Sequence, residues 1–226
     1  MKLNTLTKFL LIAHHPEKGR FIISEAHINY GIIGAALLEM SLDEQIRIEG
    51  QKLILIKDAN SENFIISEIS KEIKNAKKPR KIKYWVTKLA RKSRRFKWEI
   101  LANLEKHKLL KIEDRKFLGL IPYKKSYLIE SSIRNGLINQ LRKEALFGKN
   151  LNNDTILMLG LIEACKMHKI ITSDKQELKK LKKALKEIIK ESPIADTVDK
   201  TIKEVQAAII GAIVASTVAA SASGSN

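Results

Sequence analysis

The sequence predicts a mainly α-helical fold: a single domain with a helical-bundle core, surrounding amphipathic helices and two short β-hairpins. Of its 226 residues, 44% are hydrophobic but only 5% are aromatic, so Leu, Ile and Ala have to form the core, a composition that favours helices. Apolar residues recur at helical spacing through most of the chain, and two segments show a strand–turn–strand pattern. A chain of this length buries about 70–75% of its unfolded surface, which suffices for one domain at residues 1–222 with a disordered tail at 223–226.

The first part of the chain is expected to form two core helices and a hairpin. Apolar residues at helical spacing mark the first helix, which a polar residue at position 4 or 5 caps and which ends at Ala13. Residues 28–42 (INYGIIGAALLEMSL) predict a central helix, since their Gly and Ala residues let a neighbouring backbone approach closely. Residues 45–48 and 53–56 flank a turn that contains glycine, which predicts the first hairpin.

Three helices and the second hairpin follow. Pro79 separates a helix at residues 65–76 from one at residues 82–90, because proline lacks a backbone donor and disfavours helix at the residue before it. A helix over residues 96–107 leads into the second hairpin. Its strands are expected at residues 109–112 and 117–121, with Glu113 and Asp114 as solvated turn residues.

Four helices are expected in the last part of the chain. Their predicted ranges are 131 or 132 to 147, 154 or 155 to 168, 173 to a stop at Ser192-Pro193, and 195 to 220. The last helix is the least polar. Its sixteen uncharged residues, 207–222, are short for a bilayer span of about 20, so we expect a buried terminal helix rather than an anchor.

Positive charge is concentrated in the middle of the chain. Residues 71–116 hold 18 Lys and Arg against 5 Asp and Glu, which gives 18 − 5 = +13 of the net +17. The first 70 residues hold 7 basic and 9 acidic groups. This asymmetry indicates a polyanionic partner, and both a membrane surface and a nucleic acid present closely spaced phosphates.

Several segments occur in an order that is typical of one known family. They are LTKFLLIA with a charged turn at Gly19-Arg20, YGIIGAALLEMSL with IRIEGQKLILI, Trp85, ILANLEKHKLLKIEDRKFLGLIPYKKSYLI, and IRNGLINQLRKEAL. Together they resemble the Golgi phosphoprotein 3 family of peripheral membrane proteins, which has prokaryotic members. The resemblance covers nearly the whole chain and implies a helical domain with a four-helix core, amphipathic helices and a β-hairpin.

For eukaryotic members, the resemblance implies binding of phosphatidylinositol 4-phosphate through a pocket of one tryptophan and several arginines. This chain departs from that pocket. An ungapped alignment from Gly19 to Gly34 places Ser24 at the tryptophan position and Ile33 at an arginine position, while Gly136 and Asn139 occupy basic positions on a later helix. Because each lost arginine removes a bidentate phosphate contact, we expect the stereospecific headgroup pocket not to be kept.

Unspecific contact with anionic lipid remains the leading prediction. The partner is then an anionic membrane surface, and the protein is cytoplasmic and peripheral to the membrane. The lone Cys165 agrees with a reducing compartment. The candidate lipid- or phosphate-binding residues are the basic side chains of the middle segment and of a later helix: Arg91, Lys92, Arg94, Arg95, Lys124, Lys125, Arg134, Arg142 and Lys143.

Two other functions stay open. A helix at 96–107 followed by a hairpin is the pattern of a winged-helix nucleic-acid binder, and the basic residues before it would contact phosphate. Against this, Glu99 and Glu105 lie on the same helix, and Asn103 is its one obvious base reader. The second alternative is a scaffold or adaptor that binds protein partners or cargo.

Residues that could support catalysis or hold a metal form no recognised set. The neighbours His14 and His15 point about 100° apart on a helix and seldom chelate one ion. Cys165 and His168 have the spacing of half a zinc site, but no second pair follows, so a buried thiol beside an exposed imidazole is expected. We therefore expect a protein that is not an enzyme and that uses no cofactor or metal.

Overall fold

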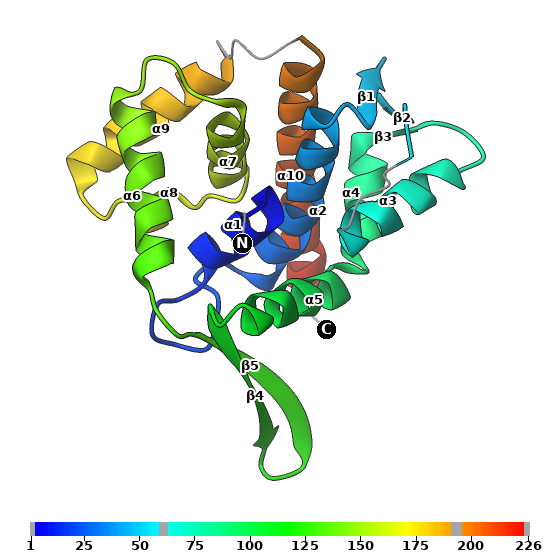
Figure 1. The fold of residues 1–226 in the computed structure, drawn as a ribbon. Helices are drawn as coiled ribbons and strands as arrows, with labels where there is room; N and C mark the ends of the chain where they lie inside the picture. The colour runs from blue at the N-terminus through cyan, green and yellow to red at the C-terminus, as the bar shows by residue number, and fades with distance from the viewer. Residues whose placement is uncertain (1–2, 59–62, 191–195, 224–226) are drawn as a thin grey trace.

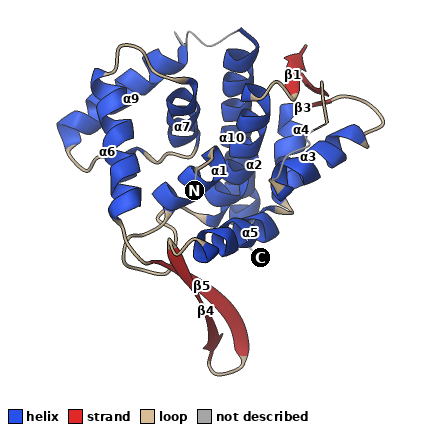
Figure 2. Ribbon diagram, viewed as in Figure 1, coloured by secondary structure: helices blue, strands red, loops and turns tan. Residues whose placement is uncertain are grey.

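The computed structural model describes residues 3–58, 63–190 and 196–223 and confirms the mainly α-helical prediction. Ten helices and two small antiparallel sheets make up this described part (Figures 1 and 2). The predicted stop at Ser192-Pro193 and residues 224–226 of the predicted tail lie outside the described residues. Ser223, which was assigned to that tail, is the last residue of helix α10 (Asp196–Ser223).

The predicted central helix is α2 (Glu25–Leu42), which begins three residues earlier than expected because Ser24 caps it. It packs against α1 (Thr5–Ala13), α7 (Asn153–Ala164), α10 and α4 (Ile82–Ala90), and these helices surround it in Figure 1. Small residues make this packing close: a Cβ on Gly31 would meet the Phe9 ring at 2.2 Å. The core therefore lies around α2, as the small-residue pattern predicted.

The first hairpin, β1 (Ile46–Glu49) with β2 (Lys52–Leu55), has the predicted place and gains a third strand. This strand is β3 (Arg80–Lys81), which pairs with β2 although α3 (Phe64–Lys74) lies between the two strands in the sequence. The sequence analysis missed it, since Pro79 was interpreted only as the end of a helix. The consequence is that the chain enters α4 directly from an extended, basic segment.

The second hairpin is longer than predicted and projects from one end of the molecule (Figure 1). It follows α5 (Ser93–Lys106) and pairs β4 (Leu110–Phe117) with β5 (Ile121–Leu128) over eight residues on each side. The predicted strand at 117–121 was wrong: these residues form the end of β4, the turn and the start of β5. Leu118 and Gly119 both have positive φ, which allows this tight turn.

The remaining helices cover the other side of the core. They are α6 (Ser132–Phe147), α8 (His168–Ile171) and α9 (Lys175–Lys190). The predicted helix 154–168 is interrupted, because α7 ends at Ala164 and Lys166 adopts positive φ before α8 begins. None of the described helices has the length and apolarity needed to cross a membrane.

Candidate functional site

A groove between α5 and the projecting hairpin brings four of the predicted residues together. It has a volume of about 620 Å³. Arg91, the C-cap of α4, lines it together with Arg94 and Arg95 at the start of α5, and Lys124 lines it from β5. Asp114 and Glu99 also line it, so the groove holds both signs of charge with a basic excess.

Two of the basic residues at the start of α5 are held by carboxylates of α3. Lys92 Nζ lies 2.5 Å from Glu72 and 3.0 Å from Glu68, and Arg95 is paired with Glu68. The hydrogen bonds that Lys92 donates to Glu72 and Glu68 raise the pKa of Lys92, and those that Glu72 accepts from Lys88 and Lys92 lower the pKa of Glu72. Among the described residues, Arg91 and Arg94 have no such carboxylate partner.

A second basic cavity, of about 280 Å³, lies beside the N-terminus of α2. Lys97 of α5 lies in it, with Nζ 2.6 Å from Glu25 and close to the rings of Phe21 and Trp98. Lys125 lines the same cavity, together with Arg20. Lys97 and Arg20 were not among the predicted site residues, because Glu25 and Lys97 are 72 positions apart in the sequence and nothing local joins them.

The groove and the second cavity form one surface, because Trp98 and Lys124 line both. We call this the hairpin-base surface. Its basic residues are Arg20, Arg91, Arg94, Arg95, Lys97, Lys124 and Lys125, and its acidic ones are Glu25, Glu99 and Asp114. It therefore has seven basic groups against three acidic ones where the hairpin leaves the body, which favours an anionic ligand.

The tip of the hairpin is apolar and exposed. Leu118 and Leu120 are 80% and 82% exposed, and the flanking Phe117 and Ile121 are 58% and 62% exposed. Four adjacent large apolar side chains at the end of a projecting element are unusual for a surface that contacts only water. The sequence signal was the run FLGLI between lysines, which was interpreted as part of a strand.

The acidic residues expected in the turn of this hairpin lie inside β4 instead. Glu113 faces Lys125 and Asp114 faces Lys124 across the two strands. Glu113 also accepts hydrogen bonds from Arg115, which lower the pKa of its carboxyl group. These carboxylates balance part of the basic charge along the strands and leave the tip uncharged.

The three predicted residues on α6 do not join the hairpin-base surface. Arg134 is only 6% exposed, its Nε has no hydrogen-bond partner among the described residues, and burial lowers its pKa. Arg142 is paired with Glu177 of α9 at 2.7 Å. Lys143 is exposed, but α6 runs away from the hairpin in Figure 1, so it lies on another part of the surface.

The four positions that depart from the eukaryotic pocket carry no basic side chain. Ile33 is fully buried in α2, and the Ser24 hydroxyl caps α2 and lies 2.7 Å from His27 Nδ1. Gly136 and Asn139 lie on α6, and neither lines the cavity beside the N-terminus of α2. Lys97 is the basic residue of α5 that lies there.

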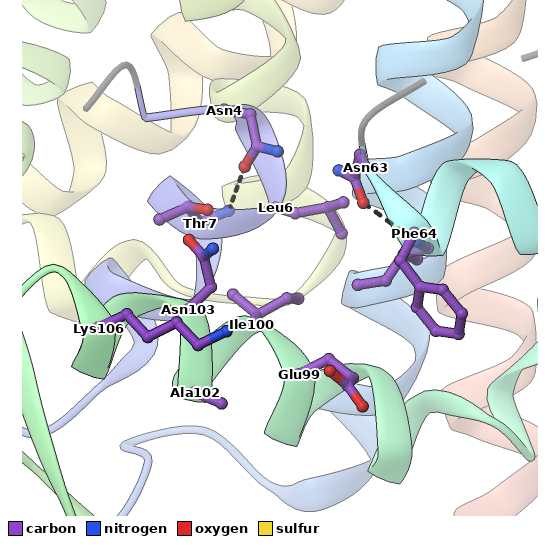
Figure 3. Close-up of a pocket in the computed structure, with 11 residues that line it drawn as sticks. Asn4, Leu6, Thr7, Asn63, Phe64, Glu99, Ile100, Ala102, Asn103 and Lys106 are labelled. Atoms are coloured by element: carbon purple, nitrogen blue, oxygen red, sulfur yellow. Dashed lines mark hydrogen bonds between the residues drawn. The ribbon is translucent and has the colours of Figure 1, made fainter. Parts of the chain in front are cut away.

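A further cavity, of about 460 Å³, lies between α5 and the N-termini of α1 and α3 (Figure 3). The backbone donors nearest to it are capped: Asn4 Oδ1 accepts from Thr7 at 2.9 Å, and Asn63 Oδ1 accepts from Ile65 at 3.0 Å. The lining side chains of α5 include Asn103 and Lys106. Together these side chains offer hydrogen-bonding groups without a recognised pairing of nucleophile and base.

Cys165 and His168, which have the spacing of half a zinc site, are both buried. Burial raises the pKa of the Cys165 thiol to about 12, so it stays protonated and unreactive near neutral pH. The imidazole of His168 was expected to be exposed, but this prediction was wrong: it is buried, with 8% of its surface exposed, and its Nε2 lies 2.6 Å from Glu163 Oε2. Within the ranges that the structure describes, no three His, Cys, Asp or Glu side chains are grouped as metal ligands.

Comparison with known proteins assigns the fold to a family. No curated protein is significantly similar to the chain. The sequence profile of the family described as Golgi phosphoprotein 3 (GPP34), however, matches residues 6–205, which extend from α1 into α10 and include the whole hairpin-base surface. The chain therefore belongs to the Golgi phosphoprotein 3 (GPP34) family.

Proposed function

We propose that this protein binds the surface of anionic membranes as a peripheral protein, with the hairpin tip in the lipid and the hairpin-base surface against the headgroups. The observation that supports this most is the exposed apolar tip with basic residues behind it. Burial of one Leu side chain contributes about 1.5–3 kcal/mol, and each basic group near an anionic surface about 1 kcal/mol. Tip and base together would suffice for stable binding.

The spacing along the hairpin agrees with this arrangement. A strand rises about 3.3 Å per residue, so Lys124 lies about 10 Å from Ile121 along β5. Interfacial segments enter a membrane by about 5–10 Å, which would place Lys124 among the headgroups. Membership of a family that is known for lipid binding supports the same role, without specifying a headgroup.

The winged-helix alternative has less support. A recognition helix needs a basic exposed face, whereas the exposed residues of α5 include Glu99 and Glu105, and its Lys97 is buried and paired with Glu25. A wing contacts phosphates through basic or polar groups, whereas the tip of this hairpin is apolar. Under the alternative of a protein scaffold, the exposed apolar tip would contact a protein instead of lipid, so vesicle binding distinguishes the two.

Replacement of both tip leucines tests the proposal. Leu118→Asn with Leu120→Asn should weaken co-sedimentation with phosphatidylserine-containing vesicles by at least about tenfold, since two apolar insertions are lost. Phe147→Asn is the matched control, because Phe147 is 77% exposed but lies at the far end of α6. Equal binding by the tip variant and the wild type would overturn the proposal.

The basic part of the site is tested separately. Arg94→Ser with Lys124→Ser should weaken vesicle binding at about 0.1 M salt and have less effect at higher salt, where exposed charges are screened. Lys179→Ser with Lys182→Ser removes the same charge from the exposed side of α9 and is the control. Competition by duplex DNA that removes the protein from vesicles at submicromolar concentration would favour the nucleic-acid alternative instead.

A further inference from the structure

The outer face of α4 forms another basic groove, which shares Arg91 with the hairpin-base surface. It has a volume of about 720 Å³, and its lining residues include Arg80, Lys81, Lys83, Tyr84, Lys88 and Arg91. The short strand β3 supplies the first two of these residues, and α4 and its C-cap supply the others. Within the described part of the chain, no acidic side chain lines this groove, in contrast to the groove at the hairpin.

The walls of this groove are apolar although its rim is basic. Tyr84 is 42% exposed and packs edge-on against Trp85, with 5.2 Å between the centroids of the two rings. The Arg80 guanidinium lies over the Tyr84 ring. Lys88 is paired with Glu72 at 2.8 Å. Among the described residues, Arg80 and Lys83 have no carboxylate partner, so the groove offers both apolar contact and uncompensated positive charge.

An apolar stripe on α10 continues this groove. The end of the Lys83 side chain lies over Gly211, where an added Cβ would be 3.9 Å from its Nζ. Val214 and Val218 are three and seven positions beyond Gly211 and therefore lie on the same face of the helix. They are 53% and 62% exposed, and Ile210 beside them is 40% exposed. Basic groove and apolar stripe thus form one surface across α4 and α10.

This α4–α10 surface is built by other elements than the hairpin, although it shares Arg91 with the hairpin-base surface. In Figure 1 the hairpin projects from one end of the molecule, whereas α4 and α10 run along its body. Insertion of the hairpin tip into a bilayer would use none of the side chains of α4 and α10. The surface is therefore available to a second partner while the protein is on a membrane.

We propose that the α4–α10 surface docks an acidic amphipathic helix of a partner protein. The aliphatic side chains of such a helix would lie on the Val214–Val218 stripe, and its carboxylates would meet Arg80 and Lys83. Charge decides between this partner and a second copy of the chain, since two molecules of net charge +17 repel when their basic faces approach. This inference goes beyond membrane binding and requires no lipid.

A designed peptide serves as the probe. It is a helix with Glu on one face and Leu on the other, compared with a peptide of the same composition whose order destroys the two faces. The protein should bind the first peptide more tightly than the second by at least about tenfold in fluorescence anisotropy. Equal binding of the two peptides would mean that only charge is recognised and would overturn the proposal.

Charge reversal on the protein locates the site. Arg80→Glu with Lys83→Glu should weaken binding of the amphipathic peptide by at least about tenfold, and Lys179→Glu with Lys182→Glu, an equal change of charge on α9, should leave it nearly unchanged. Ile210→Gln should also weaken binding, because it makes the stripe polar. Circular dichroism melts confirm that each variant is folded.

Vesicle binding separates this proposal from the proposed function. The Arg80→Glu and Lys83→Glu variant should keep its binding to phosphatidylserine vesicles within about threefold, since the hairpin-base surface is intact. If it loses vesicle binding as strongly as the tip variant, the surface belongs to the membrane site and the peptide proposal is wrong. Binding of a single-stranded oligonucleotide that displaces the peptide and is blocked by the same substitutions would also overturn it.

Discussion

Arg134 is a guanidinium that the fold buries without a carboxylate partner among the described residues. Its NH1 group donates to Asn135 at 3.2 Å, its Nε has no partner there, and burial lowers its pKa. The nearby His14 is also buried, and burial lowers its pKa as well. From the sequence, Arg134 was expected to contact lipid, because helical periodicity alone did not distinguish the buried face of α6 from the exposed one.

Replacement of Arg134 should reveal the cost of this buried charge. We expect Arg134→Met to raise the free energy of unfolding by about 1 kcal/mol in urea titrations, because a buried charge is replaced by an apolar side chain of similar length. Arg142→Met is the control and should lower it slightly, since it breaks the exposed pair with Glu177. A loss of stability in Arg134→Met would contradict this interpretation.

Glu39 makes the stability of the protein depend on pH. Burial, with a contribution from Asp43, raises the pKa of its carboxyl group from 4.5 to about 7, although backbone N–H groups of Thr5 and Leu6 donate to it. The native state therefore binds more protons than the unfolded state between these two values. Stability contributed by this group is present below pH 4.5 and is lost as the pH rises toward 7.

Substitution of Glu39 should remove this dependence. Glu39→Gln keeps the acceptor for the α1 backbone but cannot ionise, so it should stabilise the protein at pH 8 by on the order of 1–3 kcal/mol and have little effect at pH 4.5. Urea titrations of both proteins at the two pH values measure the difference. If the difference in stability between Glu39→Gln and the wild type is the same at both pH values, Glu39 does not titrate as proposed.

At the scale of the elements, α2 depends on glycine where other helices cross it. A methyl group on Gly31 would meet the Phe9 ring at 2.2 Å and Cys165 Sγ at 3.0 Å, whereas a methyl group on Gly136 of α6 would meet nothing within 4 Å. The two glycines are both helical, so they differ in packing rather than in backbone conformation.

This difference predicts opposite effects of one substitution. Gly31→Ala should lower the free energy of unfolding by about 1–3 kcal/mol, because Phe9 and Cys165 would have to move away from the added methyl group. Gly136→Ala should raise it by about 0.5–1 kcal/mol, because alanine is the better helix former and the site is open. Thermal melts of the two variants measure these changes in stability. If Gly31→Ala is more stable than the wild type, α1 and α2 cross less tightly than described.

The hairpin shows where prediction of elements from sequence fails. The core helices were predicted closely, because their apolar residues recur at helical spacing and α2 consists largely of small and aliphatic residues. Five of the eight side chains of β4 are charged, and β5 contains Pro122 and two consecutive lysines, so no alternation of apolar and polar residues marks the strands. The run FLGLI was the most apolar part and was taken for a strand instead of the tip.

At the scale of the whole molecule, the distribution of charge was predictable but its partners were not. The sequence showed a basic segment at residues 71–116. It did not show that Glu68 and Glu72, which lie at its edge, hold Lys92 and Arg95, or that Lys97 reaches Glu25. Such contacts depend on how α3, α5 and α2 pack. The fold divides the predicted basic segment between the hairpin-base surface and the α4–α10 surface.

The way in which these charges are arranged predicts how the protein distinguishes lipids. Ile33 is buried and Ser24 caps α2, so neither supplies a contact to a particular headgroup. What remains is a set of Lys and Arg side chains, which respond mainly to the density of negative charge. We expect vesicles that contain phosphatidylinositol 4-phosphate and vesicles that contain phosphatidylserine at equal charge density to bind the protein with affinities within about threefold.

Flotation over a lipid panel, with the charge of each vesicle verified by its electrophoretic mobility, measures this ratio. The Leu118→Asn and Leu120→Asn variant should show the same ratio at lower affinity, since the proposed contact of the tip is with acyl chains that both lipids share. A preference for phosphatidylinositol 4-phosphate of more than about tenfold would contradict the expectation. It would indicate that the cavity beside the N-terminus of α2, with Lys97 and Arg20, recognises the phosphorylated ring directly.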